Sequence, residues 1–322
     1  MAEKFVSCNL DGFEPSEEDM YQMAISQPLQ KKIARAIGLL KLYERKALEL
    51  DPECGYYTCF SGGKDSIVVK QLCLEAGVRF MAHYNNTTID PPELYSYIRE
   101  HHPDVRWEQM NVDKNGKFKG GFFQEVIRNG LPTPLARWCC RMFKEGGGDG
   151  KFKVVGVRAE ESSRRKKLWK EVQAKLGSEF LCPILYWTDD DVWEFIRDRK
   201  LPYCSLYDQG CKRIGCIGCP MGSAKQLDAD FKRYPKMEAA YRASALKYAK
   251  NRIDRFRSGT FKRRSTKPMY TVPEQYWFSW RNQVNRKQGR EKCVYEQMIE
   301  QMGGTSLVEK NMMDEDGADM LE

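Results

Sequence analysis

Apolar residues near the start of the chain recur at helical spacing. One set lies three to eight residues apart along a single helical face: Leu29, Ile33, Ile37, Leu40 and Leu48. Because such a stripe must pack against other parts of the protein, residues 1–54 are predicted to form a helical lead-in.

Beyond residue 55, short β-prone runs alternate with helical ones. The predicted strands are residues 56–60, 78–84, 105–110 and 153–157. The predicted helices are residues 64–76, 91–101 and 188–197, the last starting at a Thr188 cap with Asp191 three residues later. The alternation predicts an α/β fold, with a twisted parallel sheet and helices on both faces.

These patterns divide the chain into four predicted segments. They are the lead-in (1–54), the α/β domain (55–220), a basic and aromatic helical extension (221–302) and an acidic, flexible tail (303–322).

Composition excludes several classes of protein. The chain has 322 residues, of which 41% are hydrophobic and 30% charged, so wholesale disorder is excluded. No apolar run approaches the ~20 residues of a membrane-spanning helix. The first twenty residues are too acidic for a secretory signal. We therefore expect a cytoplasmic protein without a membrane partner. The sequence does not indicate an oligomeric state.

The hexapeptide Ser61-Gly62-Gly63-Lys64-Asp65-Ser66 follows a predicted strand and opens a predicted helix. Two glycines allow a tight turn whose N–H groups face an anion, and the Lys64 ammonium and two hydroxyls add donors. The turn is not a Walker A loop, because Asp65 follows the lysine. An ordinary strand-to-helix turn is the alternative.

This hexapeptide resembles the PP-loop of the ATP pyrophosphatase superfamily, whose signature is SGGxDS after the first strand. The resemblance implies an adenine nucleotide alpha hydrolase-like fold that binds ATP, with Mg²⁺ accompanying it. The implied nucleotide-binding residues are Ser61, Gly62, Gly63, Lys64, Asp65 and Ser66. Lys64 and Asp65 are also the implied catalytic residues.

Cysteine provides the second candidate chemistry. The chain has twelve Cys but three His, which in a cytosolic protein favours a metal or Fe–S site over disulfides. Cys139-Cys140 and the Cys216-x-x-Cys219 turn supply four soft ligands, suited to a [4Fe–4S] cluster or to zinc. Cys211 could replace one of the adjacent pair, since it extends the turn to a C-x₄-C-x₂-C spacing.

Several further motifs resemble the sulfonucleotide (PAPS/APS) reductase family, in the family's order and over residues 56–220. They are Trp-Cys-Cys-Arg at 138–141, Gly-Val-Arg-Ala at 156–159, Pro-Ile-Leu-Tyr-Trp-Thr at 183–188, Leu-Pro-Tyr at 201–203 and Tyr-Asp-Gln-Gly-Cys-Lys-Arg-Ile-Gly-Cys-Ile-Gly-Cys-Pro at 207–220. The resemblance implies that Cys139, Cys140, Cys216 and Cys219 ligate [4Fe–4S]. It also implies that Arg158 faces the anionic end of the nucleotide, as a third catalytic residue.

The chain departs from that family in two places. Asn86-Thr87-Thr88 stands where the family has an Asp-Thr-Gly turn, and the nucleophilic Glu-Cys-Gly-Leu-His tail is missing. Cys293 is the last Cys of the chain and lies among Lys and Arg that would lower its pKa. It is either a reactive thiol or a bystander on a helix.

Positive charge is concentrated in residues 231–292, with eighteen Lys or Arg against four Asp or Glu. The cations are interleaved with aromatic residues, a mixture that suits phosphate neutralisation and base stacking on DNA or RNA. A helical extension with a solvated basic face is equally consistent with this pattern.

Three functions remain open. The first is ATP-dependent sulfur transfer to an anionic acceptor such as DNA or tRNA, with a cysteine desulfurase as donor. The second is a PAPS or APS reductase that uses a thioredoxin-like donor. The third is a non-catalytic nucleotide-binding regulator. We favour the first, because of the missing tail and the basic segment.

Overall fold

A computed structural model describes residues 16–175, 177–260 and 270–285. Its contacts divide the chain into two compact units, which we call the sheet unit (1–85, 92–108 and 147–214) and the helical unit (86–91, 109–146 and 215–322). The two units interleave in sequence, and one crossing falls inside the glycine-rich stretch 146–150. The four-segment division made from the sequence stays a prediction.

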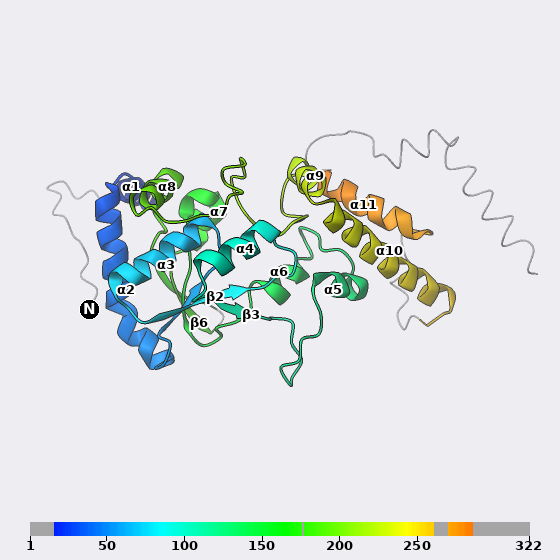
Figure 1. Ribbon diagram of the computed structural model, residues 1–322, viewed down its shortest axis with the longest axis horizontal. Coiled ribbons are helices and arrows are strands. Elements are labelled where there is room, and N and C mark those ends of the chain that lie inside the picture. Colours follow the sequence, from blue (N-terminus) through cyan, green and yellow to red (C-terminus); the bar gives the residue numbers. More distant parts are fainter. Residues whose placement is uncertain (1–15, 176, 261–269, 286–322) are drawn as a thin grey trace, which may run out of the picture. The chain divides into compact units, whose positions relative to one another are not determined.

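The sheet unit is built on one six-stranded sheet in the order β3-β2-β1-β4-β6-β5. Figure 1 labels β2, β3 and β6 of this sheet. The strands are β1 (Tyr56–Cys59), β2 (Phe80–Asn85), β3 (Arg106–Glu108), β4 (Phe152–Val154), β5 (Val172–Lys175) and β6 (Ser178–Leu181). All four strands predicted from the sequence are present, each with shorter or slightly shifted bounds, and the α/β class is confirmed.

The predicted parallel sheet is found, with one antiparallel strand at its edge. Strands β1 to β4 and β6 pair in parallel, whereas β5 pairs with β6 antiparallel. Only two residues separate β5 from β6, and so short a connection can join only antiparallel strands. The sheet is therefore mixed but mostly parallel.

The order of the strands creates a switch point beside β1. The chain runs from β1 outward through β2 to β3, and then returns to place β4 on the other side of β1. Ligands of open α/β sheets bind where the strand order reverses, outside the carboxyl ends of the strands. The loops after β1 and β4 meet that condition.

The helices of the sheet unit largely follow the sequence pattern. They are α1 (Glu17–Ile25), α2 (Leu29–Leu50), α3 (Lys64–Ala76), α4 (Pro92–His101), the 3₁₀ turn η1 (Ala159–Glu161), α7 (Ser163–Leu168) and α8 (Asp189–Asp198). Helices α2, α3 and α8 share one apolar core with β1, β4 and β6. The predicted cap is confirmed, because Thr188 accepts from the Asp191 N–H and the Asp191 carboxylate accepts from the Thr188 N–H.

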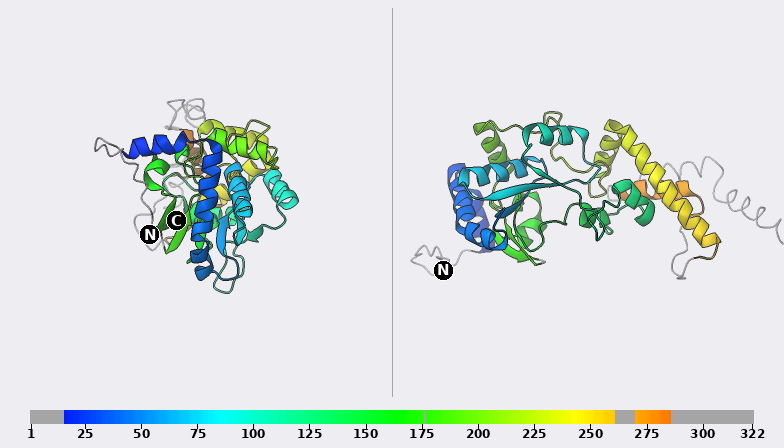
Figure 2. Two further views of the ribbon diagram at one scale, coloured as in Figure 1. Left: turned by 90° about the vertical axis from the view of Figure 1, so that its left-hand side faces the viewer. Right: turned by 60° about the horizontal axis from the view of Figure 1, so that its bottom comes forward.

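The helical unit contains α5 (Phe122–Asn129), α6 (Trp138–Phe143), α9 (Ala224–Arg233), α10 (Pro235–Arg257) and α11 (Pro273–Asn285). Helix α10 packs against both α5 and α11, and α11 lies alongside it in Figure 2. The core of the helical unit is rich in aromatic rings, among them Phe122, Phe231, Tyr241, Trp277 and Trp280. The predicted helical C-terminal extension is confirmed. Within the described residues, no helix is long and apolar enough to cross a membrane.

Candidate functional site

The glycine turn after β1 is held in one conformation by its own residues. Gly62 has φ +71°, and a Cβ there would lie 2.6 Å from a Leu94 methyl and 2.9 Å from one of Ile98, so glycine is required on both counts. The Ser66 hydroxyl donates to the Gly63 carbonyl at 2.8 Å and accepts from the Ser61 N–H at 3.2 Å. The turn is thus a rigid start to α3.

The loop after β4 approaches this turn closely. A Cβ on Gly156 would lie 3.1 Å from the backbone carbonyl of Asp65, a separation that leaves almost no room for a side chain. Because Gly156 has none, the chain passes beside α3 and brings Arg158 to the Asp65 carboxylate two residues later. The predicted catalytic residues Lys64, Asp65 and Arg158 therefore lie in one place.

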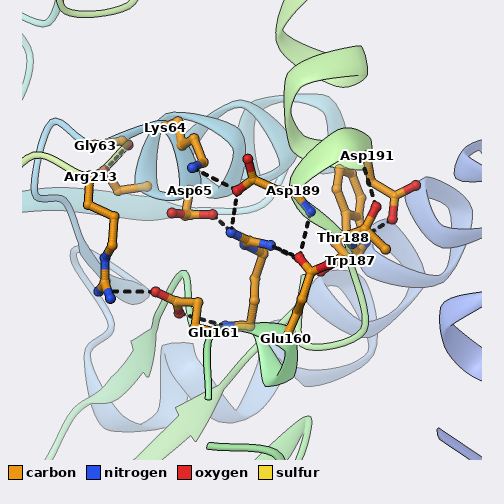
Figure 3. Close-up of polar contacts among 12 residues, drawn as sticks. Gly63, Lys64, Asp65, Glu160, Glu161, Trp187, Thr188, Asp189, Asp191 and Arg213 are labelled. Carbon is orange, nitrogen blue, oxygen red and sulfur yellow. Dashed lines mark hydrogen bonds and ion pairs between the residues drawn. The ribbon is translucent and has the colours of Figure 1, made fainter. Parts of the chain in front are cut away.

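Arg158 is 4% exposed and is surrounded by carboxylates. Its guanidinium donates to Asp65 at 2.6 Å, to Glu160 at 2.7 Å and to Asp189 at 2.8 Å. Figure 3 shows the Asp65, Glu160 and Asp189 carboxylates converging from three different segments. A buried guanidinium needs such partners, because an unpaired charge away from water is costly.

Lys64 is tied to the same cluster. Its Nζ lies 2.7 Å from the Asp189 carboxylate (Figure 3), and its backbone N–H donates to the Tyr207 hydroxyl at 2.9 Å. Partial burial opposes ionisation of Asp189, but the hydrogen bond from Lys64 and the charges of Lys64 and Arg158 outweigh it and lower the Asp189 pKa. Asp189 is therefore ionised at neutral pH.

These groups face an open cavity of about 640 Å³. Its lining includes Lys64, Asp65, Arg158, Glu160, Glu161, Asp189, Trp193, Tyr207, Gly210, Cys211, Lys212 and Arg213. Glu161 accepts from Arg213 at 3.2 Å and also pairs with Arg165. The lining of the cavity thus contains both cations and carboxylates, unlike a purely basic anion site.

Sequence reasoning missed four of the groups that shape this cavity: Glu160, Asp189, Trp193 and Tyr207. Signals in the sequence could have found two of them, Asp189 and Glu160. Asp189 follows Thr188 directly and therefore stands in the first turn of a helix. Glu160 follows Arg158 by two residues, within the loop after β4.

The four cysteines assigned from the resemblance line one small cavity in the helical unit. Cys139 and Cys140 lie on α6, and Cys216 and Cys219 lie in the turn before α9. The cavity measures about 30 Å³, room for a single ion or a water molecule. Its remaining lining is mostly apolar, and includes Ile89, Phe122, Phe143 and Tyr241.

The neighbouring thiols of Cys139 and Cys140 shift each other's pKa. The Cys139 thiol donates to Cys140, which raises the pKa of Cys139 and lowers that of Cys140. Burial raises the pKa of the Cys216 thiol to about 12. In the described part of the chain, no three or more Cys, His, Asp or Glu are arranged to hold a metal ion. The thiols share a cavity without forming a closed ligand set.

Other sequence-predicted residues lie elsewhere. Cys211 lines the cavity of the sheet unit, and Cys293 lies outside the described residues. Thr87, from the turn that departs from the family, lines the cysteine cavity, and the Thr88 hydroxyl accepts from the Phe122 N–H at 2.8 Å. That turn therefore belongs to the helical unit.

Comparison with known proteins yields distant relatives. An uncharacterized protein of Methanocaldococcus jannaschii is 28% identical over 66% of this chain. The match spans about half of that relative, 48% of its length. An adenosine 5'-phosphosulfate reductase of Staphylococcus haemolyticus is 27% identical over 51% of this chain and 69% of its own.

Among solved structures, the phosphate complex of phosphoadenylyl-sulfate (PAPS) reductase from Candida auris is similar at a TM-score of 0.40 and 14% identity. It covers 66% of this chain and 97% of its own. The phosphoadenosine phosphosulfate reductase domain model matches residues 55–221, more than half of the sequence. This stretch runs from the residue before β1 to the residue after the Cys216–Pro220 turn. It includes the glycine turn at 61–66, Arg158 and the four cysteines of the small cavity. The chain belongs to the phosphoadenosine phosphosulfate reductase domain family.

Proposed function

We propose that this protein is an adenine-nucleotide-dependent sulfur-transfer enzyme. Residues 61–66 bind ATP as its magnesium complex, with Lys64, Asp65 and Arg158 as the catalytic residues. ATP is cleaved to AMP and pyrophosphate, and sulfur enters an anionic acceptor such as DNA or tRNA.

The observation that carries this proposal is the ring of carboxylates around Arg158. Asp65, Glu160 and Asp189 all lie within 2.8 Å of its guanidinium and face the open cavity. Protein-bound Mg²⁺ typically takes one or two carboxylates together with substrate phosphates. The three carboxylates serve as ion-pair partners of the buried Arg158, and those that face the cavity would also repel a metal-free anion, whereas a magnesium polyphosphate can use them as ligands.

The proposed reaction balances without an external oxidant or reductant. An acceptor oxygen attacks the α-phosphorus and forms a P–O bond, while the bond from that phosphorus to the bridging oxygen breaks. Pyrophosphate leaves with the bonding electrons, and Lys64 and Arg158 stabilise the developing negative charge. A sulfide-level sulfur nucleophile then displaces AMP from the adenylated acceptor.

We assign Cys139, Cys140, Cys216 and Cys219 to a metal centre. Four thiols in an apolar shell suit soft metals, and the family resemblance favours [4Fe–4S], whereas the small cavity volume favours a single zinc ion. A bound centre would supply either a sulfur-handling or an electrostatic role in the helical unit.

The acceptor fits the exposed cations of the helical unit. Lys236, Lys247, Lys250 and Arg257 recur at helical spacing along α10, and their side chains are exposed. Because nucleic-acid phosphates form a regular row of negative charge, a basic stripe of this kind suits DNA or RNA without base specificity. The basic residues at 261–269 and beyond 285 lie outside the described residues.

The test is nucleotide-dependent release of pyrophosphate by anaerobically purified protein, with and without DNA or RNA. We expect release from ATP with Mg²⁺, and a loss of about 10²-fold or more in Lys64→Met, the size of effect seen when one transition-state donor is removed. Lys167→Met is the matched control, because Lys167 is an exposed lysine on α7. Equal rates in both variants contradict the proposal.

The second candidate is a PAPS or APS reductase, favoured by the domain match over residues 55–221 and by the staphylococcal relative. Sulfite release from either sulfonucleotide with a thiol donor, in the absence of Mg²⁺, would establish it in place of sulfur transfer. If nucleotide binds but neither product forms, the protein is a nucleotide-binding regulator.

A further inference from the structure

The Asp189 carboxylate contacts both Lys64 and Arg158, the two cations that the proposed function assigns to the nucleotide phosphates. A single oxygen, Oδ1, lies 2.7 Å from Lys64 Nζ and 2.8 Å from Arg158 Nη2. Asp189 is the first residue of α8, and its backbone N–H donates to Glu160 at 2.7 Å, which holds the segment in place. Its side chain is 49% exposed and lines the cavity.

The Tyr207 hydroxyl occupies the backbone N–H of Lys64 in a similar way. The Tyr207 hydroxyl accepts from the Lys64 N–H, which is a donor that the glycine turn would offer to a phosphate. Both the charged and the backbone donor of Lys64 are therefore satisfied by the protein itself. An incoming anion must compete with Asp189 for charge and with Tyr207 for a neutral hydrogen bond.

The two competitors have different consequences. Displacing the Tyr207 hydroxyl exchanges one hydrogen bond for another. Displacing Asp189 leaves an ionised carboxylate beside the bound phosphate, and like charges at contact distance repel. A divalent cation that bridges the carboxylate and the phosphate converts this repulsion into coordination, because both oxygens are ligands that Mg²⁺ accepts.

We propose that Asp189 is a specificity-determining residue, which admits adenine nucleotides chelated by a divalent cation and disfavours metal-free ones, including sulfonucleotides. The inference rests on the proposed function only in requiring that the ligand be an adenine nucleotide. It extends that function by naming the residue that selects magnesium triphosphate over a metal-free ligand.

The experiment measures by calorimetry the affinity for ATP with Mg²⁺, for ATP in EDTA and for adenosine 5'-phosphosulfate in EDTA. In the wild type we expect metal to strengthen ATP binding. In Asp189→Asn the ratio of the two ATP affinities should fall by about fivefold to tenfold, because one carboxylate no longer opposes the free anion. The metal-free sulfonucleotide should bind more tightly to the variant by a similar factor.

Three further variants make the result specific. Asp190→Asn removes the same charge from the same first turn of α8, where the side chain is exposed, and should leave the ratio unchanged. Asp189→Glu keeps the charge and should keep the metal dependence, which also tests the proposal if Asp189→Asn fails to fold. Tyr207→Phe removes a neutral competitor and should raise the affinities with and without metal alike.

The outcomes separate the two levels of the argument. If the wild type and Asp189→Asn show the same metal dependence, the role of Asp189 is wrong while nucleotide binding stands. If Asp190→Asn changes the ratio of the ATP affinities with and without Mg²⁺ as much as Asp189→Asn does, the effect comes from the net charge of the protein and not from the position of Asp189. The proposal is then overturned. If no adenine nucleotide binds the wild type, both this inference and the proposed function fail.

Discussion

Among single residues, His102 shows how a buried side chain supports the glycine turn without belonging to the site. Its Nδ1 accepts from Lys70 at 3.1 Å, and its Nε2 lies 2.8 Å from the Tyr97 hydroxyl, which donates to the Pro202 carbonyl. The ring also packs edge-on against Phe60, the residue before Ser61. The imidazole must therefore stay neutral, with its proton on Nε2.

This arrangement predicts a pH dependence of folding. Burial and then the Lys70 charge lower the pKa of His102 to about 4, against about 6.5 in an unfolded chain. Between these values the unfolded chain binds a proton that the folded chain does not, so stability falls as pH falls from about 6.5 to about 4. Urea unfolding at pH 7 and pH 5 should show this loss, on the order of 2 kcal/mol, shrinking in His102→Gln.

The neighbouring His101 provides the control, because its side chain is 38% exposed. His101→Gln should keep the pH dependence of the wild type. If His102→Gln and His101→Gln change it equally, the network around His102 does not impose the neutral imidazole described here.

At the scale of elements, α3 shows how far local sequence determines structure. The helix predicted at 64–76 is found at Lys64–Ala76, because glycines bound it at both ends. Gly63 precedes it in extended backbone, and Gly77 ends it at φ +67° in the left-handed region. The β5–β6 hairpin was missed, since Gln173, Lys175 and Glu179 place polar side chains in both strands.

Two glycines that flank α3 allow conformation and contact to be separated by experiment. Gly77→Ala meets open space at φ +67°, so it should cost about 1 kcal/mol of unfolding free energy from backbone strain alone. Gly62→Ala has a similar φ but also collides with Leu94 and Ile98, so it should cost a further 1 kcal/mol or more. Urea unfolding measures both. Equal losses would mean that the turn can move away from α4.

At the scale of the whole molecule, the cysteine cavity belongs to the helical unit and the open cavity at the glycine turn belongs to the sheet unit. Residues 86–91 and 109–146 leave the α/β region and fold with α9 to α11, and there they build the cysteine cavity. The glycine turn, Arg158 and Asp189 remain in the sheet unit. The consecutive residues Ile214 and Gly215 belong to different units, between Cys211 and Cys216.

This separation predicts where loss of a metal centre is felt. Metal that binds the native thiols stabilises the unit that contains them. Removing it anaerobically should speed hydrogen exchange in α6 and around residues 216–219, while β1, β4 and α3 keep their protection. Exchange that increases equally in the two units would contradict the assignment of the four cysteines. Cys211→Ser serves as control and should retain the wild-type metal content.

The sequence by itself determined the local features of this protein: the glycine turn, the helix caps, the paired cysteines and the alternation that makes an α/β sheet. These depend on backbone preferences of adjacent residues, so a few neighbours suffice. Only the tertiary structure decided which groups surround Arg158, that Tyr207 contacts Lys64 across 143 residues of sequence, and that Cys211 lines a different cavity from Cys139, Cys140, Cys216 and Cys219. Such partners are chosen by strand order and core packing between distant segments, and no local pattern records them.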